Sequence, residues 1–164
     1  MFALNRESME HVLVIAYGNP LRSDDGVAWQ AANELRRDLP WAARIICAHQ
    51  LTPEVAEDVS RADLVIFLDA SSTGKPGTVR CQAVSARSRK PCFSHHLAPA
   101  DLLGWCHRLY SAKPRAFLIS VDGERFDYGQ GLSVRALNAV PLVVERVSKL
   151  IDHARQESRA QRSL

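Results

Sequence analysis

The stretch HVLVIAYGNPLRSDDG, residues 11–26, decides the fold of this chain. Its first seven residues form an apolar run of strand length, and the turn residues Gly18, Asn19 and Pro20 end that run at once. A helix is predicted next, because apolar residues recur at three- to four-residue spacing: Val27, Ala31, Leu35 and Leu39. A strand that turns directly into a helix is the building unit of an α/β fold.

Two adjacent carboxylates, Asp24 and Asp25, stand at this junction. A helix N-terminus after a strand usually attracts phosphate, because its free N–H groups and its dipole favour an anion. Here two acids already occupy the positive end, and the loop lacks the G-x-G-x-x-G and G-K-[ST] patterns of nucleotide sites. The junction therefore indicates a cation site and disfavours nucleotides. The structural alternative is that Ser23 or the aspartates only cap the helix.

The rest of the chain continues the alternation of strand and helix. Strands are predicted at residues 43–48, 64–68, 77–83 and 116–121, with 77–83 at a sheet edge. Helices are predicted at residues 52–60, from Pro99 and from Ser133, with a frayed tail beyond Arg155. The later two helices carry apolar stripes: Leu102, Leu103, Cys106 and Leu109, then Leu137, Val140, Val144, Val147 and Ile151. Continuously apolar strands indicate a three-layer α/β/α sandwich around a mainly parallel, twisted sheet.

Composition narrows the function classes. A chain of 164 residues suits one domain, and its net charge of +3 comes from scattered basic residues, so no nucleic-acid face is predicted. The cluster Arg87–Lys90 is a solvated loop or a docking point for an acidic partner. No apolar run is long enough for a membrane span, and the N-terminus lacks a signal-peptide core, so we expect a soluble cytoplasmic protein. Four well-separated cysteines are expected to be reduced and mostly packed: Cys47, Cys81, Cys92 and Cys106.

A second acid and two histidines complete the candidate site. Asp69 follows the apolar run 64–68, and the carboxyl ends of parallel strands meet at one edge of the sheet. We therefore expect Asp25 and Asp69 to share a crevice, although a turn carboxylate is the alternative for Asp69. His95 and His96 precede the helix at Pro99. Two carboxylates and one imidazole form a ligand set that suits nickel, zinc or iron. A Ser-His-Asp triad lacks support, because no G-x-S-x-G elbow is present.

Three motifs together resemble the hydrogenase maturation peptidases over nearly the whole chain: Gly18-Asn19-x-Leu21-x-x-Asp24-Asp25-Gly26, Asp69-Ala70 and His95-x-Leu97-x-x-x-Asp101-Leu102-Leu103. The resemblance implies one domain over residues 1–164 with a phosphorylase/hydrolase-like α/β fold. It implies an endopeptidase that removes the C-terminal extension of the immature large subunit of a nickel-iron hydrogenase after nickel insertion. The metal-contacting residues of the family fall on Asp25, Asp69 and His95, with His95 preferred over His96.

The resemblance leaves the mechanism and the substrate open. We expect the substrate to supply the nickel, rather than the enzyme to bind it tightly. Nickel can polarise the scissile carbonyl or activate a water, or a carboxylate can act as general base in the manner of aspartic peptidases. The main alternative function is a non-catalytic nickel-binding or chaperone module for the precursor. A flavodoxin-like ligand-binding domain is a third alternative, which the acidic turn disfavours.

One segment departs from a branch of the family. His49–Glu54 replaces a glycine-rich Asp-Gly-Gly-Thr-like loop, and Asp127–Leu132 fits the branch that serves cytoplasmic, cofactor-coupled hydrogenases. We expect His49 and Glu54 to lie near the crevice, where they can contact the substrate.

Overall fold

The computed structural model describes residues 12–87 and 97–162. A five-stranded sheet forms its centre, in the order β2-β1-β3-β5-β4. The neighbours β2, β1, β3 and β5 run parallel, and β4 lies antiparallel to β5 at the edge. The strands are β1 (Val12–Tyr17), β2 (Arg44–Ala48), β3 (Leu64–Ser71), β4 (Val79–Ala83) and β5 (Arg115–Asp122). The mainly parallel sheet and the edge position of residues 77–83 are therefore as predicted.

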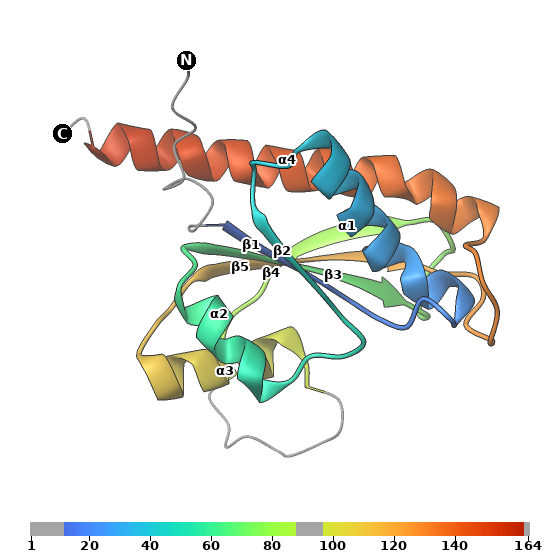
Figure 1. The fold of residues 1–164 in the computed structure, drawn as a ribbon, viewed down its shortest axis with the longest axis horizontal. Helices are drawn as coiled ribbons and strands as arrows, with labels where there is room; N and C mark the ends of the chain where they lie inside the picture. Colours follow the sequence, from blue (N-terminus) through green and yellow to red (C-terminus); the bar gives the residue numbers. More distant parts are fainter. Residues whose placement is uncertain (1–11, 88–96, 163–164) are drawn as a thin grey trace.

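Helices cover both faces of the sheet, which gives three layers (Figure 1). One face packs under α1 (Val27–Asp38) and α4 (Val134–Arg162), and the other under α2 (Ala56–Ser60) and α3 (Pro99–Tyr110). Two separate apolar cores result, because successive side chains of a strand point to opposite faces. In β1, Val14 belongs to the first core and Ile15 to the second. The α/β/α sandwich predicted from the continuously apolar strands is confirmed.

The junction before α1 differs from the predicted cap. A short 3-10 turn, η2 (Ser23–Gly26), contains both aspartates, and Gly26 occupies the N-cap position of α1 without a side-chain hydrogen bond. Neither Ser23 nor Asp24 caps the helix, so that prediction is wrong. The reason is that Asp24 is fully buried and turns toward a distant loop instead.

The last helix is longer than the sequence pattern suggested. Its predicted start is confirmed, because Ser133 Oγ accepts a hydrogen bond of 3.2 Å from the backbone N–H of Ala136. The frayed tail beyond Arg155 is wrong, since α4 continues to Arg162. Contacts with the α1–β2 connection and with β5 hold this extension: Arg155 donates to the carbonyl of Ala42 at 3.1 Å, and Glu157 pairs with Arg115 at 2.5 Å.

The predicted apolar stripes are buried only where the sheet lies beneath them. Leu109, in the last turn of α3, is 56% exposed, and Leu137, near the start of α4, is 49% exposed.

Of the cysteines, Cys106 is buried, Cys47 half-buried and Cys81 exposed, while Cys92 lies outside the described residues. Cys81 is exposed on the edge strand β4, although its register partner Ile119 belongs to the core under α1 and α4. Within residues 12–87 and 97–162, no helix is both long and apolar enough to cross a membrane.

Candidate functional site

The candidate site lies where β1 and β3 reach the carboxyl edge of the sheet. Tyr17 is the last residue of β1, and Asp69 lies within β3, which continues three residues beyond the predicted strand end at Leu68. The hydroxyl of Tyr17 donates a hydrogen bond to the Asp69 carboxylate. The backbone N–H of Ala70 donates to Asp69 Oδ1 at 2.8 Å. Two donors therefore fix the orientation of this half-buried carboxylate.

Asp25 reaches the same place from the turn after β1. Its Oδ2 accepts a hydrogen bond of 2.7 Å from the backbone N–H of Asn19, so the turn itself holds the side chain. The negative charge of Asp25 acts on Asp69 and raises the pKa of that carboxyl. The structure thus brings together the two carboxylates that the strand ends predicted as neighbours.

The proton affinity of Asp69 is unusual for an aspartate. Burial is the largest cause and, with the charge of Asp25, it raises the pKa of Asp69 to about 6, against the opposing hydrogen bonds from Tyr17 and Ala70. Burial also raises the pKa of Tyr17 strongly, and the neighbouring Asp69 raises it further, so the hydroxyl remains a donor. A carboxyl that titrates near neutral pH is suited to proton transfer.

Glycine is required at position 18 for this turn. Gly18 has a φ of +136°, and a Cβ placed there would lie 2.2 Å from the carbonyl oxygen of Asp25. The side chain of Asn19 closes the next turn, because its Oδ1 accepts the N–H of Leu21 at 2.9 Å. The sequence Gly-Asn-Pro therefore lets the chain fold back tightly enough for Asn19 to hold Asp25.

Asp24, next to Asp25, faces away from the site and is completely buried. Its carboxylate accepts four hydrogen bonds: the backbone N–H groups of Glu124 (2.7 Å), Arg125 (3.1 Å) and Ser133 (2.7 Å), and the hydroxyl of Ser133 (2.8 Å). Burial alone would raise the pKa of Asp24, but these donors together lower it. Asp24 therefore stabilises the structure and is not a group that exchanges protons near neutral pH.

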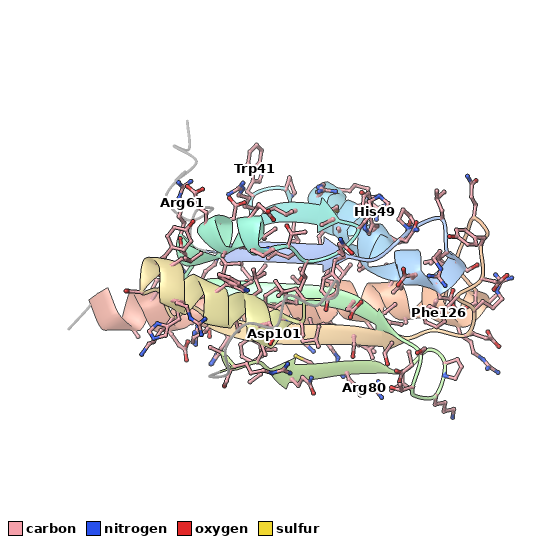
Figure 2. All side chains as sticks on the ribbon, turned by 90° about the horizontal axis from the view of Figure 1, so that it is seen from below. Trp41, His49, Arg61, Arg80, Asp101 and Phe126 are labelled. Atoms are coloured by element: carbon pink, nitrogen blue, oxygen red, sulfur yellow. The ribbon has the colours of Figure 1, made fainter. Side chains whose placement is uncertain are left out.

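Further contacts join the turn of residues 18–26 to the loop of residues 123–133. Ser23 Oγ donates to the carbonyl of Asp127 at 3.0 Å, and Arg22 Nε donates to the carbonyl of Phe126 at 3.2 Å. The guanidinium of Arg22 also lies over the Tyr128 ring, 5.6 Å from its centre. Phe126 marks this loop at the end of the molecule in Figure 2. The loop of residues 123–133 thus supports the turn that carries Asp25.

The third member of the predicted set cannot be placed here. His95 and His96 lie outside the described residues. In the part of the chain that the structure describes, no three His, Cys, Asp or Glu side chains gather as a metal site. The set of Asp25, Asp69 and His95 therefore stays a prediction.

The other predicted contact residues lie on the surface. His49 follows β2 and is exposed, with its ring edge against Trp29 at 5.5 Å between ring centres. Trp29 in turn donates to the carbonyl of Ala48 at 3.2 Å, which places this pair at the carboxyl end of β2, beside β1. Glu54 is exposed in the turn η3 (Pro53–Val55). From the docking cluster 87–90, only Arg87 is described, and it pairs with Asp101 at 3.1 Å.

Sequence reasoning missed two features of this edge, Tyr17 and the pair of Arg80 and Asp122. Asp122 ends β5, is fully buried, and accepts a hydrogen bond of 2.5 Å from Arg80 at its Oδ1. Its pattern, an acid at the end of an apolar strand, is the same as the one that identified Asp69. For Tyr17, the signal was a lone hydroxyl at the end of the first apolar run.

Three solved structures are similar to this chain over most of its length. The hydrogenase maturating endopeptidase HybD from E. coli is 21% identical with a TM-score of 0.70, covering 88% of this chain and 93% of its own. The [NiFe] hydrogenase maturation protease HybD from Thermococcus kodakarensis is 20% identical with a TM-score of 0.65, covering 86% and 99%. The [NiFe] hydrogenase maturation protease HycI from Thermococcus kodakarensis KOD1 is 14% identical with a TM-score of 0.68, covering 92% and 99%.

These likenesses concern the fold. No family model matches the sequence, and no curated protein matches it. At identities of 14–21%, the three structures establish that this chain has the fold of those proteases, with its open and mainly parallel sheet.

Proposed function

We propose that this protein is an endopeptidase that removes the C-terminal extension from the large-subunit precursor of a nickel-iron hydrogenase after nickel has been inserted. The observation that carries the proposal is the placement of Asp25 and Asp69 at the carboxyl edge of the sheet, near enough for the charge of Asp25 to raise the pKa of Asp69. The likeness to hydrogenase maturation proteases over 86–92% of the chain supports it. The reaction would take place in the cytoplasm, with the precursor as partner and without nucleic acid or membrane.

The two carboxylates supply what peptide hydrolysis requires. Cleavage needs a group that takes a proton from water and a group that returns one to the leaving amine. Asp69, with a pKa of about 6, exchanges a proton readily near neutral pH. The hydroxyl of Tyr17 and the charge of Asp25 face it, so a proton can be held between these groups. This is the aspartic-type route.

The nickel of the proposed reaction belongs to the substrate. In this proposal Asp25, Asp69 and His95 contact the nickel that the immature subunit already carries, so a precursor without nickel is not cut. Oxygen and nitrogen donors of this kind suit nickel. Bound there, the metal would polarise the scissile carbonyl or an attacking water. The two carboxylates of this chain would orient the precursor through that contact.

The test is cleavage of a precursor with and without nickel. The purified protein is incubated with nickel-loaded and nickel-free large-subunit precursor, and intact masses are measured, alongside Asp25→Asn, Asp69→Asn and His95→Ala. Asp152→Asn, an exposed acid on α4, is the matched control. Loss of a C-terminal peptide from the nickel-loaded precursor alone, abolished by the three variants and kept by the control, supports the proposal. A stable complex with unchanged precursor mass would instead indicate a chaperone.

A further inference from the structure

A row of polar side chains crosses three strands from Asp69 to the edge of the sheet. Asp69 in β3 is in register with Ser120 in β5, and Ser120 is in register with Arg80 in β4. Partners in register point to the same face of a sheet. The row therefore runs from the carboxylate of the candidate site to the exposed arginine of the edge strand.

This row lies on the face that α2 and α3 cover elsewhere. Phe67 in β3 and Leu118 in β5 pack in the core beneath those helices, and alternation puts Asp69 and Ser120 on the same side. Among the described residues beyond these helices, Ser120 is half-buried and Arg80 is exposed. Figure 2, which views the sheet from this side, shows Arg80 beyond the end of α3.

The guanidinium of Arg80 is held in place and points toward the candidate site. One terminal nitrogen, Nη2, donates to Asp122 Oδ1 at 2.5 Å and to Ser71 Oγ at 3.2 Å. Ser71 belongs to β3, so the side chain of Arg80 reaches across β5 toward the strand of Asp69. Ser71 is two residues from Asp69, a separation of about 7 Å along a strand.

The surrounding loop leaves part of the guanidinium available. The side chain of Arg80 is 47% exposed, and Nε and Nη1 have no hydrogen-bond partner among the described residues. A Cβ at Gly74 would lie 2.0 Å from Asp122 Oδ2 and 2.7 Å from Arg80 Nη1, so glycine lets the loop pass close to the pair. The buried Asp122 fixes the arginine, while about half of the Arg80 side chain stays exposed.

We propose that Arg80 binds a carboxylate of the substrate's C-terminal extension, two or three residues from the scissile bond. The inference rests on the proposed function, and it adds a specificity-determining residue to it. An extended peptide advances about 3.3 Å per residue, so a scissile bond at Asp69 places such a carboxylate within reach of Arg80. Asp25 and Asp69 repel an acidic peptide, which a guanidinium on the same face offsets through charge-assisted hydrogen bonds. The carboxylate is either an acidic side chain or the chain terminus.

The test compares charged and neutral extensions. Cleavage of the nickel-loaded precursor is measured as kcat and KM for the wild-type protein, Arg80→Gln and Arg80→Glu. Arg61→Gln is the matched control, because Arg61 is a surface arginine that pairs with Glu57 on α2. The precursor is used in three forms: unchanged, with the acidic side chains of the extension converted to amides, and with an amidated C-terminus. Binding of each form is measured in parallel.

We expect Arg80→Gln to raise KM for the unchanged precursor roughly tenfold with little change in kcat, since one charge-assisted contact is lost. Neutralising the carboxylate that Arg80 binds should raise KM for the wild-type protein by the same factor. It should also remove the difference in KM between wild type and Arg80→Gln. The precursor form that meets both conditions identifies the carboxylate. Arg80→Glu should favour a precursor with lysine at that position.

Equal loss on all three precursor forms would overturn the inference, because a structural role of Arg80 does not depend on substrate charge. The inference would also be overturned if kcat and KM of Arg80→Gln equalled those of Arg61→Gln. If the wild-type protein binds but does not cut the precursor, the proposed function fails. The affinities of the charged and neutral forms for wild type and Arg80→Gln then still decide the role of Arg80.

Discussion

Two regions of the molecule use neighbouring aspartates in opposite ways. Between the turn of residues 18–26 and the loop of residues 123–133, Asp24 is fully buried and accepts four hydrogen bonds, which lower its pKa. In the candidate site, Asp69 has two donors and a second acid nearby, and burial and that acid raise its pKa to about 6. The number of donors that face each buried carboxylate therefore separates a stabilising acid from a reactive one.

The largest effect on cleavage is expected from removing the carboxylate of Asp69. Asp69→Asn should lower the rate of precursor cleavage by about 1000-fold, because a group that transfers protons is lost. The rate is measured from intact masses in single-turnover reactions, with Asp152→Asn as control. If Asp69→Asn cleaves as fast as the control, the precursor is not cut at the candidate site.

Removal of the stabilising acid should damage the fold. Asp24→Ala leaves the N–H groups of Glu124, Arg125 and Ser133 without their acceptor, which costs about 3 kcal/mol or more of stability. The free energy of unfolding is measured by urea titration at neutral pH. Ser133→Ala, which removes one of the four donors to Asp24, should cost less. A loss below that of Ser133→Ala would contradict the anchoring role.

The two aspartates should also give opposite slopes of stability against pH. The folded-state pKa of Asp69 is about 6 and its ordinary value is 3.8, so the folded state binds more protons between these values. Stability should therefore fall as pH rises from about 4 to 6, by up to about 3 kcal/mol, and Asp69→Asn should abolish that fall. A wild-type curve that matches that of Asp69→Asn over this range would contradict the raised pKa.

Asp24 should give the opposite dependence of stability on pH. Its folded-state pKa lies below the ordinary 3.8, so its contribution is complete above the unfolded value. That contribution should be lost as pH falls below about 4. The same unfolding series measures it, with Asp24→Asn as the variant that lacks this loss.

The smallest expected effect on the cleavage rate is that of Tyr17→Phe. Tyr17→Phe removes the hydrogen bond that lowers the pKa of Asp69, so that pKa should rise further. We expect cleavage at neutral pH to fall roughly fivefold, the effect of about 1 kcal/mol in one hydrogen bond. The midpoint of the pH–rate profile should move upward, and an unmoved midpoint would place Tyr17 outside the site.

The layers of this fold were predictable because they follow from local patterns. Apolar runs and turn residues set the strands, and the alternation with helices set the parallel sheet. The ends of elements were less predictable, since contacts made far along the chain decide them. Arg155 extends α4 through Ala42, more than a hundred positions earlier in the sequence.

The site was predictable only in part, for the same reason. Asp25 and Asp69 follow from the rule that strand ends meet at one edge. The role of Asp24 depends on Ser133, 109 positions away, so no local motif separates it from Asp25. Arg80 and Asp122 are 42 positions apart, and their pairing follows only from the register of β4 against β5.

The link between Asp24 and Ser133 also sets the order of events during synthesis. Ser133 caps α4 and donates to Asp24, so one serine joins the last helix to the first turn. Because a ribosome makes the chain from its N-terminus, Asp24 emerges long before its partners do. Asp24, in the turn that carries Asp25, therefore gains its two hydrogen bonds from Ser133 only when the start of α4 has been made. A nascent chain that already carries Asp25 and Asp69 still lacks these contacts of Asp24.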